Sequence, residues 1–99
     1  RGASESEEAF QCDLALAYMR GVKNYDKALQ TVNAVITANP EQAYAYYVRA
    51  RILTEQEKLE EAIADLTKAA ELAAAQKNSK LEIDANTHKS AVLRYGSWE

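Results

Sequence analysis

The side chains that most often perform catalysis are few and scattered in this chain. It has one histidine, His88, and one cysteine, Cys12, which are separated by most of the sequence. No nearby serine or cysteine is paired with a positioned carboxylate, and His88 lies on an apolar helical stripe, so we interpret it as a partly buried structural residue. Cys12 lies beside leucines without a basic neighbour, and we interpret it as a small buried or half-buried hydrophobe. The sequence therefore predicts no catalytic residue.

The acidic residues form two clusters, and neither has the pattern of a metal site. They are Glu5, Glu7 and Glu8, and then Glu57, Glu60 and Glu61. Both clusters lack the glycine and the alternating oxygen ligands of a calcium loop, and both suit the start of a helix, where the macrodipole favours negative charge. One Cys and one His exclude an all-Cys/His zinc site, and there is no Gly-rich phosphate loop. We therefore expect no metal, no cofactor and no enzymatic activity.

The composition indicates one small all-α domain or a few units of a repeat array. The 99 residues carry 12 Lys and Arg against 15 Asp and Glu, a net charge of −3 with no block of one sign. A nucleic-acid-binding protein usually has a basic face, so nucleic acid is not an expected partner. No apolar run approaches the roughly 20 residues of a membrane span. Only three Gly and one Pro interrupt a chain dominated by good helix formers.

Helical periodicity extends over nearly the whole chain and divides it into five segments. Ser4 with Glu7 resembles a capping box at the start of the first segment. Asn39-Pro40 stops the second segment, because proline disfavours helical geometry in the preceding residue, and Pro40 suits the first turn of the third. Since no methionine starts the chain, we interpret residues 1–3 as a processing or cloning remnant, in a fragment of a longer protein. The segments cover about residues 4–21, 25–39, 41–56, 59–75 and 80–95.

Each segment carries apolar residues at helical spacing, which predict its buried face. The predicted stripes are Phe10, Leu14 and Tyr18; Ala28, Leu29, Val32, Val35 and Ile36; Tyr46, Ala50 and Leu53; Ala62, Ile63, Leu66, Ala69 and Leu72; and Leu81, Ala85, His88, Val92 and Tyr95. The short loops between the segments force antiparallel neighbours.

The sequence also repeats itself. A shift of 34 residues places Tyr25 on Leu59 and Ala28 on Ala62. Upstream, a shift of 35 residues places Ala15 on Ala50. Two helical hairpins of nearly equal length are therefore predicted, followed by a fifth helix.

Helix–turn–helix units of this period resemble the tetratricopeptide repeat. Ala28, Val32 and Pro40 fit the second half of its pattern, whereas Ala74 stands where the second unit would have its terminal proline. The tryptophan and the Leu-Gly pair of the first-helix pattern are absent. The resemblance divides the single domain into about 9–42, 43–76 and a terminal helix or incomplete third unit at 80–99. A generic helical bundle is the alternative.

Small residues are expected where the two helices of one hairpin cross. Ala15 would face Ala28, and Ala50 would face Ala62, because helices approach closely only through small side chains. Trp98 stands where Tyr25 and Leu59 stand in the earlier units.

The resemblance implies a right-handed superhelix whose concave face, formed by the first helix of each unit, holds a partner segment. The residues expected on that face are Cys12, Leu16, Met19, Arg20, Tyr44, Tyr47 and Arg51. Tyrosine and arginine are common binding hot spots, although tyrosine also packs well at half-exposed helix seams. Tyr46 is expected to point into the stack instead.

The family's carboxylate clamp, which holds chaperone tails, requires lysine and asparagine on these helices. The corresponding positions hold Cys12, Leu16, Val48, Ile83 and Thr87. We therefore expect a protein or peptide partner other than a chaperone tail.

The sequence thus predicts an all-α repeat domain that serves as a protein–protein interaction module. The alternative is a structural slice of a longer solenoid, or a unit that self-associates through its terminal helix. An enzymatic function is the weakest of the three hypotheses.

Overall fold

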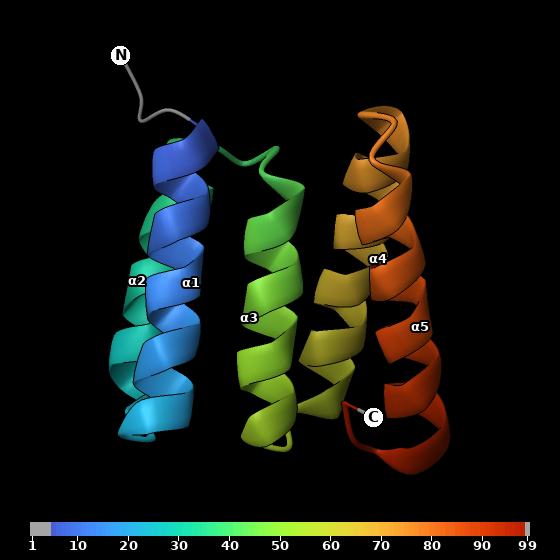
Figure 1. The fold of residues 1–99 in the computed structure, drawn as a ribbon. Coiled ribbons are helices and arrows are strands. Elements are labelled where there is room, and N and C mark those ends of the chain that lie inside the picture. Colours follow the sequence, from blue (N-terminus) through green and yellow to red (C-terminus); the bar gives the residue numbers. More distant parts are fainter. Residues whose placement is uncertain (1–4, 99) are drawn as a thin grey trace.

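The computed structural model describes residues 5–98, which form five α-helices joined by short turns (Figure 1). The helices are α1 (Glu5–Gly21), α2 (Tyr25–Ala38), α3 (Ala43–Glu55), α4 (Leu59–Ala75) and α5 (Ser79–Tyr95). Within this range there is no β-strand, so the prediction of an all-α helical repeat is confirmed. The predicted remnant at residues 1–3 and the predicted capping residue Ser4 lie outside the described range.

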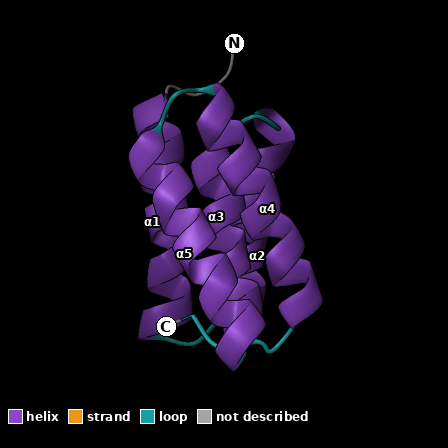
Figure 2. Cartoon of the chain, turned by 90° about the vertical axis from the view of Figure 1, so that its right-hand side faces the viewer, coloured by secondary structure: helices purple, strands orange, loops and turns teal. Residues whose placement is uncertain are grey.

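The helices form two layers. Figure 2, viewed from the α5 side, shows α1, α3 and α5 on one side of the molecule and α2 and α4 on the other. Consecutive helices run antiparallel and pack as hairpins, and α3 contacts helices of both hairpins. The layer of α1, α3 and α5 is the one on which the sequence predicts a binding face.

Asparagine side chains cap the start of two helices. The Asn24 side chain accepts a hydrogen bond from the Lys27 backbone N–H at 3.0 Å, and Asn78 accepts one from Leu81 at 3.2 Å. Each satisfies a backbone donor that the first turn of the helix leaves unpaired. Asparagines between the apolar segments are therefore start signals as well as breaks.

The start of α3 differs from the prediction. The sequence places Pro40 in its first turn, but the helix begins at Ala43. The Asn39 side chain accepts a hydrogen bond from the Glu41 backbone N–H at 3.2 Å, so the chain first makes a local turn. Gln42 then caps the helix through its side-chain oxygen.

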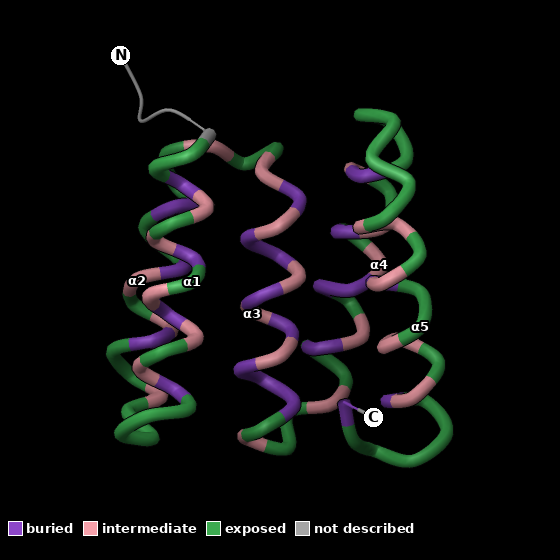
Figure 3. Tube along the Cα trace, in the orientation of Figure 1, coloured by how far each residue is buried: buried purple, intermediate pink, exposed green. Residues whose placement is uncertain are grey.

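Two hydrophobic clusters, both built on α3, form the core. The first joins α1, α2 and α3 and includes Cys12, Val32 and Val48. The second joins α3, α4 and α5 and includes Leu66 and Trp98. Figure 3 shows buried residues all along α3 and mostly on one side of the other helices. The four alanines predicted at the helix crossings are all fully buried; they are Ala15, Ala28, Ala50 and Ala62.

Two of the predicted stripes are wrong at their ends. Phe10 is 61% exposed and Tyr95 is 68% exposed. The buried face of α1 consists of Glu8, Cys12, Ala15 and Met19. These residues also form one face of the helix, but this face is rotated by about one residue around the helix axis relative to the predicted stripe. The small side chains of Cys12 and Ala15 allow the close approach of α2 and α3, and large ones at these positions would prevent it.

Candidate functional site

A groove runs along the α1–α3–α5 side of the molecule. It consists of two cavities of about 330 and 240 Å³ that share Tyr44, Asn78 and Leu81. The first is bounded by the starts of α1, α3 and α5, and the second lies between α3 and α5. We call these two cavities together the tyrosine groove.

Tyr44 and Tyr47 form the α3 wall of the groove. Their rings stack with a centroid distance of 6.0 Å and an interplanar angle of 22°. The Tyr44 hydroxyl donates a hydrogen bond to Oδ1 of Asp13 on α1 at 2.7 Å, which fixes that ring between the helices. Both tyrosines are half-buried, so each ring is held by the protein while part of it stays accessible.

The opposite wall of the second cavity belongs to α5. It is formed by Leu81 and Asp84, together with Lys80. Lys80 Nζ lies 2.9 Å from Asp84 Oδ2, and its side chain is 87% exposed. This wall combines an apolar side chain with a carboxylate that pairs with a solvent-exposed lysine of the same helix.

Trp98 fills the rest of the space between α3 and α5. Its ring stacks on His88 with a centroid distance of 4.1 Å and meets Tyr47 edge-on at 5.3 Å. The Arg51 guanidinium lies over its face at 5.5 Å. His88 Nδ1 is 2.7 Å from the Trp98 carbonyl oxygen, which ties the segment after α5 back to that helix. His88 is therefore partly buried and structural, as the sequence predicts.

The groove is open between α3 and α5 because of one large side chain. A shift of 35 residues places Cys12 on Tyr47. Cys12 is small, and α3 packs directly on α1 with Val48 and Ile52 fully buried. Tyr47 is bulky and meets α5 through the His88 ring, at a centroid distance of 5.7 Å. The gap that results accommodates Trp98 and leaves the second cavity open.

The structure brings together only part of the predicted face. Tyr44, Tyr47 and Arg51 are half-buried on the groove side of α3, while Leu16 is half-buried against the first core cluster and Arg20 is exposed in the last turn of α1.

The predicted groove positions of Cys12 and Met19 are wrong, since their exposed fractions are 0% and 3%. Both pack against α3 within the first core cluster. Burial raises the pKa of the Cys12 thiol to about 12, with smaller contributions from nearby carboxylates. Cys12 is therefore a buried hydrophobe, which agrees with its other interpretation from the sequence.

Burial also raises the pKa of both groove tyrosines. At Tyr44 the hydrogen bond to Asp13 adds to the effect, because the carboxylate stabilises the protonated phenol. At Tyr47 the charge of Asp84 acts in the same direction and Arg51 opposes it. Both phenols therefore remain neutral donors at physiological pH.

Sequence reasoning did not place Asp84 or Trp98 in the groove. Asp84 gives no signal, since it lies outside the apolar stripe of its helix. Trp98 is aligned with Tyr25 and Leu59, which both pack at the core of their units. That alignment is a sign of burial, but its contact with Tyr47 depends on the gap between α3 and α5.

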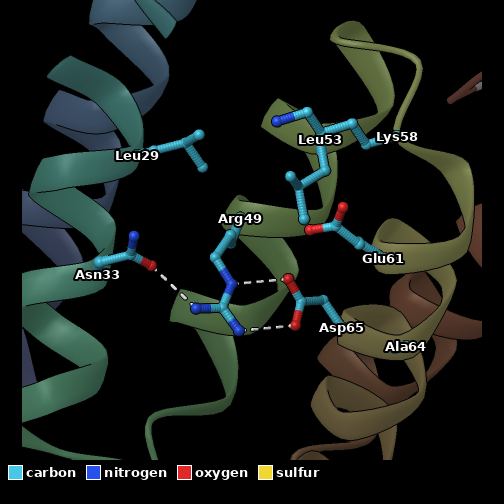
Figure 4. A pocket seen from close by; sticks show the side chains of 8 residues that line it. All are labelled: Leu29, Asn33, Arg49, Leu53, Lys58, Glu61, Ala64 and Asp65. Carbon is cyan, nitrogen blue, oxygen red and sulfur yellow. Dashed lines mark hydrogen bonds and ion pairs between the residues drawn. The ribbon is translucent and has the colours of Figure 1, made fainter. Parts of the chain in front are cut away.

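A larger cavity of about 410 Å³ lies on the other side of α3, between α2 and α4 (Figure 4). There Arg49 donates two hydrogen bonds to the carboxylate of Asp65, at 2.7 and 2.9 Å, and one to Asn33 at 2.9 Å. The bond to Asp65 raises the pKa of Arg49, although burial acts against it. Because the Arg49 guanidinium on α3 is already bound to residues of α2 and α4, we interpret this cavity as a structural joint between the three helices.

Other kinds of site have no support in the described part of the chain. No group of His, Cys, Asp or Glu side chains within it has the arrangement of a metal site. Among the helices described, none is both long and apolar enough to cross a membrane.

Comparison with known proteins identifies one unit of the repeat. Residues 43–76, which comprise α3 and α4, match the sequence model of the tetratricopeptide repeat. No curated protein and no solved structure gives a significant match to the chain.

Proposed function

With a tetratricopeptide repeat established at residues 43–76, we propose that the tyrosine groove binds a segment of a partner protein. Repeats of this kind stack into extended binding surfaces and serve as protein-interaction modules. The observation that carries the proposal is the stacked pair of Tyr44 and Tyr47: Tyr44 lines both cavities of the groove, and Tyr47 lines the second. Tyrosine supplies a large apolar surface and a polar tip at low entropic cost, and it is enriched at binding hot spots.

The filled half of the gap supports this proposal. Trp98 lies against Tyr47 and His88 and is only 5% exposed. The space between α3 and α5 therefore accepts a large side chain from a segment without regular secondary structure. A partner segment in the open half would contact the same Tyr47 ring and extend this row of aromatic contacts toward Tyr44.

The experiment requires a partner and a pair of matched tyrosine variants. The partner would be isolated by affinity capture on the protein and identified by mass spectrometry. Tyr44→Ala should then weaken its affinity by about 1–2 kcal/mol or more, as is typical of a hot-spot aromatic. Tyr95→Ala removes an exposed tyrosine outside the groove and should leave the affinity unchanged.

Tyr44 is a better probe than Tyr47 because it does not touch Trp98. Each variant would be checked by thermal melting, so that loss of fold is separated from loss of binding. Equal affinities of Tyr44→Ala and the wild type for the partner would contradict the proposal.

Self-association is the second candidate, and the exposed apolar residues at the ends of the stack favour it. Phe10 on α1 is 61% exposed, and Ile83 and Leu93 on α5 are 62% and 63% exposed. Concentration-dependent dimers in light scattering that are lost in Phe10→Ser or Leu93→Ser would support this candidate. A monomer at all concentrations would exclude it.

A further inference from the structure

We infer that the open half of the tyrosine groove, between α3 and α5, binds an arginine side chain carried by the partner segment. The inference rests on the proposed function and adds the chemistry that the groove recognises. It follows from comparing this half of the groove with two other places in the molecule where an arginine lies on an aromatic ring.

On the opposite side of α3, an aromatic ring, a guanidinium and a carboxylate occur together. The Arg49 guanidinium lies 5.5 Å from the centre of the Tyr46 ring and forms two hydrogen bonds to the Asp65 carboxylate. A second arginine, Arg51, lies 5.5 Å from the ring of Trp98 in the filled half of the gap. In this molecule, an aromatic ring on or beside α3 is thus repeatedly paired with a guanidinium.

The open half of the groove has the ring and the carboxylate but no guanidinium. Tyr44 and Tyr47 line one wall, and Asp84 lies on the other, in a cavity of about 240 Å³. Tyr47 and Asp84 line this same cavity, and the charge of Asp84 adds to the effect of burial in raising the pKa of Tyr47. Lys80 pairs with Asp84, but a lysine that is 87% exposed contributes little to such a pair and is readily displaced.

An arginine satisfies this site better than other side chains. Its planar guanidinium stacks on an aromatic face and forms two parallel hydrogen bonds with a carboxylate, whereas the lysine ammonium is a strongly hydrated point charge. An acidic side chain would be repelled by Asp84 and by Asp13, which accepts the Tyr44 hydrogen bond at the other end of the ring pair. The net charge of −3 also favours a basic segment.

The test is the selection of peptides from a random library of dodecamers on the immobilised full chain. Selected peptides would be synthesised, and their affinities measured by fluorescence anisotropy for the wild type and for Tyr44→Ala, Asp84→Asn and Lys80→Ala. We expect peptides that require Tyr44 to contain a common arginine. Their affinity should fall about tenfold or more in Asp84→Asn and when that arginine is replaced by lysine, because a charge-assisted pair is lost.

Lys80→Ala tests the same site in the opposite direction. Removing the competing ammonium should strengthen binding of the arginine peptides about two- to fivefold, which is the scale of an exposed ion pair. Two exposed residues of α4 that line no described cavity provide the controls. Glu71→Gln matches the charge change of Asp84→Asn, Lys68→Ala matches that of Lys80→Ala, and both should leave affinity unchanged.

The possible failures are distinguishable. Peptides that require Tyr44 but lack a common arginine, or that bind Asp84→Asn as tightly as the wild type, would overturn this inference and leave the proposed function standing. If no selected peptide loses affinity in Tyr44→Ala, the groove is not a binding site and both proposals fail. Melting curves of all variants would confirm that each one folds.

Discussion

Replacing Trp98 with alanine tests whether the segment after α5 is part of the folded core. Trp98 is 5% exposed and contacts the Tyr47 and His88 rings and the Arg51 guanidinium. A fully enclosed Trp→Ala change costs about 3–5 kcal/mol. Since Trp98 lies at the edge of its cluster and part of the cavity would fill with water, we expect a loss of about 2–3 kcal/mol.

A loss of that size is easily measured. For a domain of this length, 1 kcal/mol corresponds to about 4–8 °C, so Trp98→Ala should melt about 10–20 °C lower than the wild type. Trp98→Phe keeps the ring stack and should lose about half as much or less. Melting followed by circular dichroism would give both values.

Fluorescence separates a packed Trp98 from a loosely attached one. Trp98 is the only tryptophan, so its emission reports its own surroundings. Its emission should be blue-shifted in the native state and should change at the same temperature as the helical signal. If Trp98→Ala melted within about 2 °C of the wild type, or if the emission changed well before the helices unfolded, the assignment of Trp98 to the core would be refuted.

Four further predictions concern the core. Ala62→Leu should lower the free energy of unfolding by about 1–3 kcal/mol through overpacking, whereas Ala64→Leu on the exposed side of α4 should change it by less than about 0.5 kcal/mol, as thermal melting would show. Tyr46→Ala should cost about 3 kcal/mol or more, because it leaves a cavity and removes the hydrogen bond from the tyrosine hydroxyl to a backbone carbonyl; urea unfolding would measure this loss. Asp65→Asn should cost about 2–3 kcal/mol, since it leaves a part-buried guanidinium without its ion pair, and a value near zero would show that the pair is only a surface contact. The Cys12 thiol should not react with iodoacetamide at pH 8 until the protein unfolds, and mass spectrometry of native and denatured samples would reveal any earlier modification.

The hairpins could be predicted from the sequence because two independent signals agree. The spacing of apolar residues sets the length of each helix, and the period of 34 or 35 residues sets their pairing. The crossing alanines follow from the same alignment, since residues that stack in equivalent places must have equivalent sizes. The burial of Ala28 and Ala62 was therefore predictable without any knowledge of the turns.

The faces of the helices were harder to predict, because they depend on what packs against each helix. Cys12 and Met19 are predicted to face a partner, but α3 covers them. Tyr47, aligned with Cys12, stays partly open because its size keeps α5 at a distance. One substitution in the repeat thus changes a buried seam into a groove, and periodicity does not contain that information.

The position of α3 in both hydrophobic clusters has a consequence for how the domain loses its structure. Repeat arrays often unfold in steps, because each unit contacts only its neighbours and the ends fray first. Here neither hairpin can separate without exposing one face of α3, so the two halves should unfold in a single cooperative transition. Amide hydrogen exchange should accordingly be slowest in α3 and should quicken outward toward α1 and α5. A ligand that binds α3 would then slow the local unfolding of α1 and α2, even though it makes no contact with α2.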